Sequence, residues 1–312
     1  MRIVSYNVRY FGHATRGLAS TRKAVTRIAK AFAELDPLPG LLCLQEVETS
    51  SIRSTLADPS TKPGETQLGR LMDAFDHALH AAGKTDRYEA YYFPAHSYRV
   101  GEATPIYTTG LAVLAHKDFL VVDHHNAGEP IDITHRNLHP IRGLKQTRIC
   151  AHVRFRYRGT KTIDVFNTHL SLPSTMSREF WLSPARLGYG LNQVEEAKNL
   201  AAFVSKECAS DRFIVVGDFN ALPGSPVYNY LVGEAGYRDA FAEVQKMDEG
   251  ALLDWPTAGF MALRMHLDHV FSGSSLKWLD FKGSHRFGDR ESSFHGLSDH
   301  MPLIGHCHLG DP

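Results

Sequence analysis

The stretch Phe213–Pro226, FIVVGDFNALPGSP, carries an apolar run directly into a pair of polar side chains. Residues 213–216 are all apolar and predict a buried strand that ends near Gly217. Because successive strand residues point to opposite faces, Asp218 and Asn220 are expected to project to the same side. Asp, Asn, Pro and Gly are also common turn residues, so this segment alone fits a turn as well as a functional site.

Five other segments place Asn, Asp, Glu or His at the boundary of an apolar run. They are RIVSYN ending in Asn7, LLCLQE ending in Glu46, DVFNTHL with His169, HLDHVF with Asp268, and GLSDHMPLIGH with Asp299 and His300. Each of them alone could be a cap or a turn, and Asn7 by itself fits a simple strand end better than a site. Six in one chain are hard to assign to chance, because polar groups at strand ends can converge on one edge of a sheet.

The rest of the pattern predicts an α/β protein in which strands outnumber helices. Strands are expected at Arg2–Tyr6, Leu41–Leu44, Tyr88–Phe93, Leu111–Ala115, Arg148–Arg156, Thr162–Asn167, Phe213–Val216, Leu267–Phe271 and Met301–His308. Helical spacing of apolar residues is found in residues 20–35, 67–82 and 192–208. Short connections between some strands favour mixed sheets over purely parallel ones. The long stretch 124–148 is expected to be irregular, and loops of that length are usually functional or disordered.

Length and charge allow one ordinary globular domain. The chain has 312 residues, 43% hydrophobic and 22% charged, with no linker or repeat, so a single domain over residues 1–312 is expected. Lys and Arg number 34, as do Asp and Glu, and this balance does not favour non-specific coating of nucleic acid. A local basic groove is still allowed. The segment 136–148 contains four basic residues and no acid, and could either flank an anionic substrate or be a solvated loop.

The four cysteines, Cys43, Cys150, Cys208 and Cys307, form no CxxC pair, and three of them lie in apolar runs typical of strands. Free thiols are therefore expected, which suits a cytoplasmic protein. The N-terminal residues MRIVSYNVRYF lack the apolar core of a leader, and no segment approaches the length of a membrane span. We also expect a monomer.

The six motifs, in this order, resemble the endonuclease/exonuclease/phosphatase superfamily, which has the DNase I-like fold. The matching segments are SYN, LQE, NTHL, GDFN, LDHVF and SDH, which run from residue 5 to residue 300. The resemblance implies an α/β four-layer sandwich, with two mixed β-sheets face to face and helices outside. It also implies divalent-metal-dependent hydrolysis of a phosphate ester.

Within this resemblance, each residue has a chemical role. Glu46 is the first choice of metal ligand, with Asn7 and Asp299 nearby, because hard oxygen ligands suit Mg²⁺ or Mn²⁺. Asp218 would orient or deprotonate the attacking water. Asn220 would hold that carboxylate or a phosphate oxygen without adding negative charge.

The histidines complete the expected site. His300 would donate to a phosphate oxygen as an imidazolium, and Asp268 would orient it and raise its pKa. His169 would contact the phosphate or protonate the leaving group. The chain has 18 histidines, so most must be non-catalytic. His124, His125, His306 and His308 are expected to face no convergent carboxylates.

The substrate is the open question, since one fold serves many substrates. A nuclease or related phosphodiesterase is the first hypothesis, with a phosphate-ester substrate such as nucleic acid. The second is a phosphatase or phospholipase-type enzyme, similar to sphingomyelinases, acting on a lipid headgroup or small phosphate ester. A non-catalytic binding module ranks last, because it predicts the loss of a core group and none is missing. Residues 171–190, with Trp181 among several aromatic residues, are a candidate substrate-selecting lid, or else Trp181 fills a local core.

Overall fold

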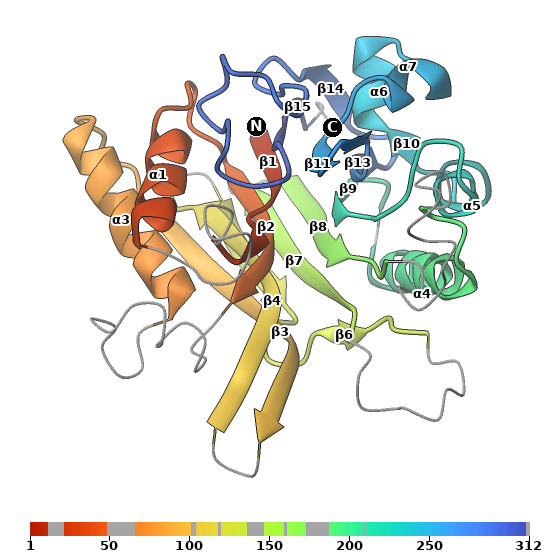
Figure 1. Cartoon of the computed structure of the whole chain (residues 1–312), viewed down its shortest axis with the longest axis horizontal. Coiled ribbons are helices and arrows are strands. Elements are labelled where there is room, and N and C mark those ends of the chain that lie inside the picture. Colours follow the sequence, from red (N-terminus) through yellow and green to blue (C-terminus); the bar gives the residue numbers. More distant parts are fainter. Residues whose placement is uncertain are drawn as a thin grey trace.

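The computed structural model describes residues 1–11, 22–48, 66–100, 104–117, 120–135, 147–158, 161–172, 187–208 and 210–309. Two mixed β-sheets pack face to face, and helices cover their outer faces (Figure 1). This is the α/β four-layer arrangement that the motifs imply. Residues 173–186 of the proposed lid (171–190) and residues 136–146 of the basic segment (136–148) lie outside the described residues.

The first sheet has the strand order β14-β15-β1-β2-β4-β3. Its strands are β1 (Arg2–Asn7), β2 (Leu41–Glu48), β3 (Tyr88–Val100), β4 (Thr104–His116), β14 (Lys277–Asp280) and β15 (Leu303–His308). Strands β1 and β2 run parallel, whereas the other neighbours are antiparallel.

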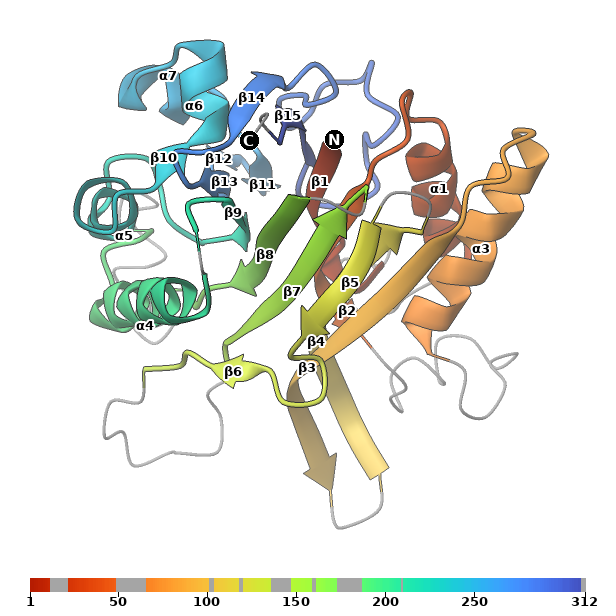
Figure 2. The same ribbon diagram turned by 180° about the vertical axis from the view of Figure 1, so that it is seen from behind.

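The second sheet has the order β10-β13-β9-β8-β7-β5, and β6 also pairs with β7 (Figure 2). Its strands are β5 (Leu120–His125), β6 (Ile131–Asp132), β7 (Ile149–Tyr157), β8 (Lys161–His169), β9 (Phe213–Asp218), β10 (Arg238–Asp239) and β13 (Asp268–Ser272). Here β8 and β9 are the parallel pair. The hairpin β11 (Ala258–Phe260) and β12 (Leu263–Met265) forms a separate two-stranded sheet.

Helices α1 (Arg22–Ala33) and α3 (Gln67–Ala81) cover the outer face of the first sheet, and α4 (Leu191–Glu207) lies on the far side, against the second (Figure 1). Helix α1 forms because Val25, Ile28 and Phe32 recur on one face, and all three are buried. Helix α3 begins at Thr66, whose Oγ1 accepts a hydrogen bond from the backbone N–H of Gly69 at 3.0 Å. Shorter elements are η1 (Arg9–Phe11), α5 (Pro226–Asn229), η4 (Tyr230–Glu234), α6 (Ala240–Gln245) and α7 (Glu249–Leu253).

Two apolar cores hold the layers together. One fills the space between the sheets and extends under α4, and the other lies between the first sheet and helices α1 and α3. All four cysteines are free, as expected, and three of them are buried in strands of these cores: Cys43, Cys150 and Cys307. Within the described ranges, none of the helices combines the length and apolar character that crossing a bilayer requires.

The topology brings the ends of six strands to one edge of the sandwich. Strands β1, β2, β8 and β9 run parallel in pairs, so their carboxyl ends share that edge. Strands β13 and β15 are antiparallel to β9 and β1, so their first residues lie there too: Asp268 pairs with Asp218, and Leu303 pairs with Ser5. The motif residues therefore meet because of strand direction, although they span almost 300 residues of sequence.

The nine expected strands are all present, and the three helical patterns form α1, α3 and α4. The expectation that 124–148 is wholly irregular is wrong, because β5 continues to His125 and β6 pairs with β7. These strands were missed because most of their residues are exposed, as befits the edge of a sheet, so an alternation of buried and exposed positions does not mark them.

Candidate active site

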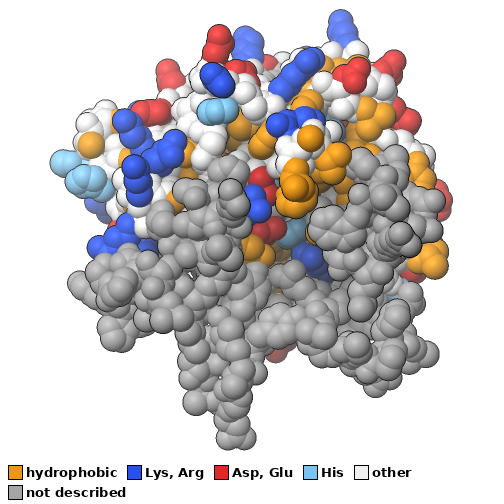
Figure 3. Space-filling view, viewed as in Figure 1, with side chains coloured by type: hydrophobic (Ala, Val, Ile, Leu, Met, Phe, Trp, Pro, Cys, Tyr) orange, Lys and Arg blue, Asp and Glu red, His pale blue; other side chains and the backbone are white. Residues whose placement is uncertain are grey.

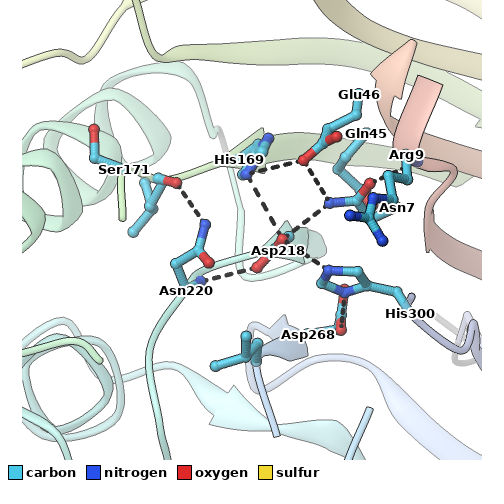
Figure 4. Close-up of polar contacts among 12 residues, drawn as sticks. Asn7, Arg9, Gln45, Glu46, His169, Ser171, Asp218, Asn220, Asp268 and His300 are labelled. Carbon is cyan, nitrogen blue, oxygen red and sulfur yellow. Dashed lines mark hydrogen bonds and ion pairs between the residues drawn. The ribbon is translucent and has the colours of Figure 1, made fainter. Parts of the chain in front are cut away.

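Asp218 lies at the centre of the strand-end cluster (Figure 4). Its Oδ2 accepts a hydrogen bond from Nδ2 of Asn7 at 3.0 Å and lies 3.6 Å from Nε2 of both His169 and His300. Its Oδ1 accepts a hydrogen bond from the backbone N–H of Asn220 at 3.0 Å. One carboxylate thus joins residues from β1, β8, β9 and the segment before β15.

Glu46 stands beside this centre. Nδ2 of Asn7 donates to Oε1 of Glu46 at 3.2 Å, and Nε2 of His169 is 3.9 Å from the same oxygen. A bulge in the pairing of β2 with β4, between Leu44 and Val47, re-aims the strand, and Glu46 adopts a positive φ of 55° there. Backbone strain of this kind often marks functional sites.

Asp299 lies beside this cluster, and its ion-pair partner was not predicted from the sequence. Its Oδ2 forms an ion pair with Nη1 of Arg9 at 2.7 Å. The backbone N–H of Arg9 also donates to Oδ1 of Asn7 at 2.9 Å, which fixes the amide so that its NH₂ group faces Asp218 and Glu46. Arg9 comes two residues after Asn7, just beyond the end of β1, and this closeness in sequence is the feature that could have predicted its role.

His300 is held between two carboxylates. Its Nδ1 lies 2.9 Å from Oδ2 of Asp268, and its Nε2 faces Asp218. The hydroxyl of Thr257 donates to the same Asp268 oxygen at 2.6 Å and accepts from the Asp268 backbone N–H at 3.1 Å. Thr257 was missed because nothing in its local sequence marks it.

Burial and neighbouring charges shift the pKa values in this cluster. Burial, together with repulsion from Asp268, raises the pKa of Asp218 to about 7. Burial and the nearby Asp299 raise the pKa of Glu46. Burial alone would lower the pKa of His300, but Asp268 and Asp218 outweigh it and raise that pKa well above its ordinary value.

His169 behaves in the opposite way to His300. Burial, with the positive charges of Arg148 and His300, holds the pKa of His169 well below its ordinary value. At neutral pH the site therefore contains one cationic imidazole and one neutral one. Such a division of protonation states among neighbouring groups is typical of catalytic sites.

A buried network fixes the loop that follows β9. The side-chain amide of Asn220 donates to the Leu170 carbonyl at 2.9 Å, so it is the backbone of Asn220, and not its side chain, that contacts Asp218. Nε2 of Gln193 donates to the carbonyls of Asn220 and Ser171 at 2.9 and 2.7 Å. Gln193 lies on α4, far from any motif, and was missed for that reason.

Gly217 has a physical reason to be glycine in this loop. Its φ is 150°, and a Cβ there would meet the carbonyl oxygen of Thr168 at 2.0 Å. Strands β8 and β9 could not approach so closely with a side chain at this position. The glycine thus lets His169 and Asp218, which are paired across these strands, stand side by side.

Other histidines lie elsewhere. His269 follows Asp268, but its Nε2 lies 2.9 Å from the Ala221 carbonyl in the core. Two histidines expected to lack convergent carboxylates each face a single one. Nδ1 of His306 lies 3.5 Å from Oδ2 of Asp280, and His124 lies near Glu207.

In the space-filling view, acidic, basic and histidine side chains lie together near the centre of the face, with a group of hydrophobic side chains beside them (Figure 3). Next to His169 is a shallow pocket, and Thr109, Gly110 and Arg148 contribute to its lining. Two groups of described residues have the composition and spacing to hold a metal ion, and one of them is the buried triad Asp218, Asp268 and His300. In that triad the imidazole already bridges the two carboxylates.

Comparison with known proteins agrees with the family that the sequence motifs resemble. The profile of the Endonuclease/Exonuclease/phosphatase family matches residues 4–300. The structure is similar to an endonuclease/exonuclease/phosphatase family protein from Leptotrichia buccalis C-1013-b, with 17% identity, a TM-score of 0.65 and 99% of each chain covered. It is also similar to the human Nocturnin catalytic domain, with 17% identity, a TM-score of 0.62, and 99% of this chain and 93% of that chain covered.

A third similar structure is a mannosyl-6-phosphatase from Bacteroides thetaiotaomicron VPI-5482, with 15% identity, a TM-score of 0.57 and 99% of each chain covered. At these identities the structural likeness establishes the fold. The comparison with curated proteins gives no significant match.

Proposed function

The chain belongs to the endonuclease/exonuclease/phosphatase family, and we propose that it is a divalent-metal-dependent hydrolase of phosphodiester bonds, a nuclease or related phosphodiesterase. Members of this family are hydrolases that act on phosphoesters, and they typically use a divalent metal. The observation that carries the proposal is the convergence on Asp218 Oδ2, where Asn7, His169 and His300 all place a nitrogen within 3.0–3.6 Å.

The residues around Glu46 fit a hard divalent cation. Glu46 and Asp299 are both carboxylates at the solvent side of the cluster, with 17% and 18% of their side chains exposed. Their mutual repulsion contributes to the raised pKa of Glu46, and a cation between them would relieve it. We assign Glu46 as the principal ligand, with Asn7 and Asp299 beside it. To contact the ion, Asn7 would present its amide oxygen in place of the NH₂ group that faces Glu46, and Asp299 would exchange its ion pair with Arg9. When bound, Mg²⁺ or Mn²⁺ supplies Lewis-acid stabilisation of the phosphoryl and leaving-group oxygens.

Asp218 is the residue best placed to receive a proton from the attacking water. Two donors, Nδ2 of Asn7 and the backbone N–H of Asn220, fix its two oxygens in place. Its pKa of about 7 is close to neutral, where a general base combines a sufficient deprotonated fraction with a sufficient driving force. Asn220 contributes by its backbone N–H and by tying the β9 loop to Leu170.

His300 and His169 have different proposed roles, because their pKa values are shifted in opposite directions. His300, kept cationic by Asp268, can donate from Nε2 to a phosphate oxygen and oppose the charge that develops there. His169 is neutral at pH 7 and is therefore suited to contact the phosphate through a neutral N–H, rather than to act as a general acid, because little of it carries the proton to be donated. Of the two roles expected for His169 from sequence, phosphate contact is the one its lowered pKa favours.

A second candidate, hydrolysis of a lipid headgroup or small phosphate ester, is favoured by apolar groups beside the site. Phe260, Met261 and Leu263 are exposed on the β11–β12 hairpin, whose Ala258 forms a bridge with His300. Leu172, three residues after His169, is exposed as well. Such side chains could pack on an acyl chain.

The first experiment is a substrate panel. EDTA-treated protein is assayed with Mg²⁺ or Mn²⁺ on single- and double-stranded DNA, RNA, sphingomyelin, phosphoinositides and an aryl phosphodiester. We expect metal-restored cleavage of phosphodiesters, with nucleic acids as the best natural substrates. Preferential turnover of sphingomyelin or the phosphoinositides would select the second candidate. Full activity after metal removal would contradict the mechanism.

A matched pair of variants tests the metal assignment. Glu46→Gln is expected to weaken Mg²⁺ or Mn²⁺ binding and to lower kcat/KM by at least ~10²-fold, because it removes the anionic ligand without changing shape. The control is Glu195→Gln on the exposed surface of α4, where Glu195 pairs with Lys198, and it should leave both quantities unchanged. Equal metal affinity in the Glu46→Gln variant and the wild type, measured by calorimetry, would remove Glu46 from the ligand set.

A further inference from the structure

The outer face of the second sheet, beneath α4, carries a second cluster of metal-ligating residue types. His124 on β5, His152 on β7 and Glu207 at the end of α4 each offer one ligand atom, and these atoms all lie within 4.8 Å of one another. The imidazole rings of His124 and His152 have centroids 5.5 Å apart. Nothing in the proposed hydrolytic mechanism uses these residues.

The hydrogen bonds of His152 determine which of its nitrogens is free. Oδ1 of Asp164 lies 2.7 Å from Nε2 of His152 and also accepts from Nε of Arg154 at 2.8 Å. An ionised carboxylate only accepts, so Nε2 of His152 must carry the proton. Nδ1 then holds a lone pair, and this atom is fully buried with no hydrogen-bond partner in the described part of the chain. A buried polar atom without a partner calls for an explanation such as an ion.

The His152 ring is also held rigidly. It stacks on Phe166 at a centroid distance of 4.5 Å and an interplanar angle of 7°, and it meets Phe203 of α4 edge-on at 6.1 Å. Nη2 of Arg154 donates to the backbone carbonyl of Glu207 at 2.5 Å, which fixes the end of α4 over the sheet. The ligand-bearing backbone is therefore pre-organised from two sides, and a metal would impose little further ordering cost.

From this geometry we propose that His124, His152 and Glu207 form a transition-metal site of the zinc type. Two imidazoles and a carboxylate are a ligand set that Zn²⁺ accepts readily, whereas Mg²⁺ prefers oxygen ligands alone. The Asp164–His152 pair supplies the carboxylate–histidine arrangement that commonly supports a metal-bound imidazole. With three protein ligands, the fourth position of the tetrahedron is open to water.

The required adjustment is small. Zn–N and Zn–O distances near ~2.0 Å place tetrahedral ligand atoms about 3.3 Å apart, so the cluster must contract from its present spacing. His124 is exposed and Glu207 is half-buried, so a bound ion would draw both side chains toward the buried His152. Nζ of Lys206 lies 3.9 Å from Oε1 of Glu207, and 79% of the Lys206 side chain is exposed. Because exposed ion pairs contribute little to stability, a bound cation would displace Lys206 at little cost.

The site is separate from the catalytic edge. His152 pairs with Phe166 on β8, and residues of β8 alternate between faces, so Asp164 and Phe166 face α4 while His169 faces the site between the sheets. A metal here would join β5, β7 and the end of α4. It would stabilise the folded state by binding it in preference to the unfolded chain.

The test uses Co²⁺ as a spectroscopic substitute for Zn²⁺, with the full chain in excess Mg²⁺ to occupy the oxygen-rich catalytic edge. We expect wild-type protein to bind one Co²⁺ with the intense visible absorption of a four-coordinate ion, and Zn²⁺ to displace it and raise the Tm by several degrees. His124→Ala should lower the Co²⁺ affinity by at least ~10-fold and abolish the Tm rise. The matched control is His125→Ala, the adjacent exposed histidine, which should behave as wild type.

Three results would overturn the proposal. They are the absence of Co²⁺ binding by wild-type protein at micromolar metal, equal affinity in the wild type and the His124→Ala variant, and the same loss of affinity in the His125→Ala variant. Glu207→Gln is a second variant with the same expectation as His124→Ala. Because the readouts are metal spectra and melting curves in Mg²⁺, they are independent of whether the chain hydrolyses any phosphate ester.

Discussion

Two polar clusters lie on opposite faces of the same strand, β8, and they handle charge differently. On the inner side, His169 joins Asp218, where burial and neighbouring charges leave pKa values strongly displaced. On the outer side, Asp164 is buried but accepts from both His152 and Arg154. In the inner cluster, burial and repulsion from neighbouring charges are not fully offset by hydrogen bonds. In the outer cluster, hydrogen bonds neutralise the Asp164 carboxylate, and only Nδ1 of His152 lacks a partner among the described residues.

This contrast distinguishes residues that serve catalysis from residues that stabilise the fold. Unmet buried charge costs folding free energy but gives groups that can move protons or bind an anion. A buried carboxylate with charged and neutral donors at good geometry is instead costly to disrupt. Equivalent substitutions on the two faces should therefore have opposite consequences for activity and stability.

The largest expected effect is on activity at the inner cluster. Asp218→Asn removes the proposed base while preserving shape, and kcat should fall by ~10²–10⁴-fold. Because burial raises the pKa of Asp218 to about 7, its ionisation in metal-free protein opposes folding as pH rises from about 4 to 7. The variant should therefore show no loss of Tm at pH 7, and it should lose less stability than the wild type over that pH range. A fall in Tm with kcat retained would reverse the assignment.

The outer cluster should give the opposite pattern. Asp164→Ala leaves His152 and Arg154 without their shared acceptor, and breaking a buried pair of this kind costs about 3–5 kcal/mol. Urea denaturation of metal-free protein measures the loss, and kcat per folded molecule should stay close to that of the wild type. If kcat fell by as much as in Asp218→Asn while stability held, the two faces would not be functionally distinct.

A smaller effect concerns pH. In wild type, Asp268 and Asp218 raise the pKa of His300, so the imidazolium persists through neutral pH. Loss of the His300 proton should then limit activity on the alkaline side, whereas protonation of Asp218 limits it on the acid side. Asp268→Asn removes the closer of these charges and should move the alkaline limb of kcat/KM to lower pH by about one unit or more. An unchanged limb would mean that another group titrates there.

The same substitution has a consequence for stability. A histidine with a raised folded-state pKa contributes stability that is fully present below about pH 6.5 and is lost as pH rises through its folded-state pKa. In metal-free protein, Asp268→Asn should flatten this part of the stability profile. NMR titration of His300 checks the shift directly, and Asp280, which faces His306 on β15, provides a control when changed to Asn.

The sequence determined the inner cluster because each of its members sits at the end or start of an apolar run. Asn7, Glu46, His169, Asp218 and His300 could be named from their local pattern and their family resemblance, and parallel and antiparallel pairing brings them together. The apolar periodicity likewise specified nine of the strands and the three long helices. Local patterns suffice here because strand ends are local features and the sheets align them.

Only the tertiary structure decided the rest. Arg9, Thr257 and Gln193 act through partners that local sequence cannot identify, and Asn220 contacts Asp218 by its backbone rather than by its side chain. The outer cluster was invisible for the same reason. His124 and His152 lie within strands and Glu207 ends a helix, so their proximity arises from sheet pairing and from the packing of α4, and not from any spacing along the chain.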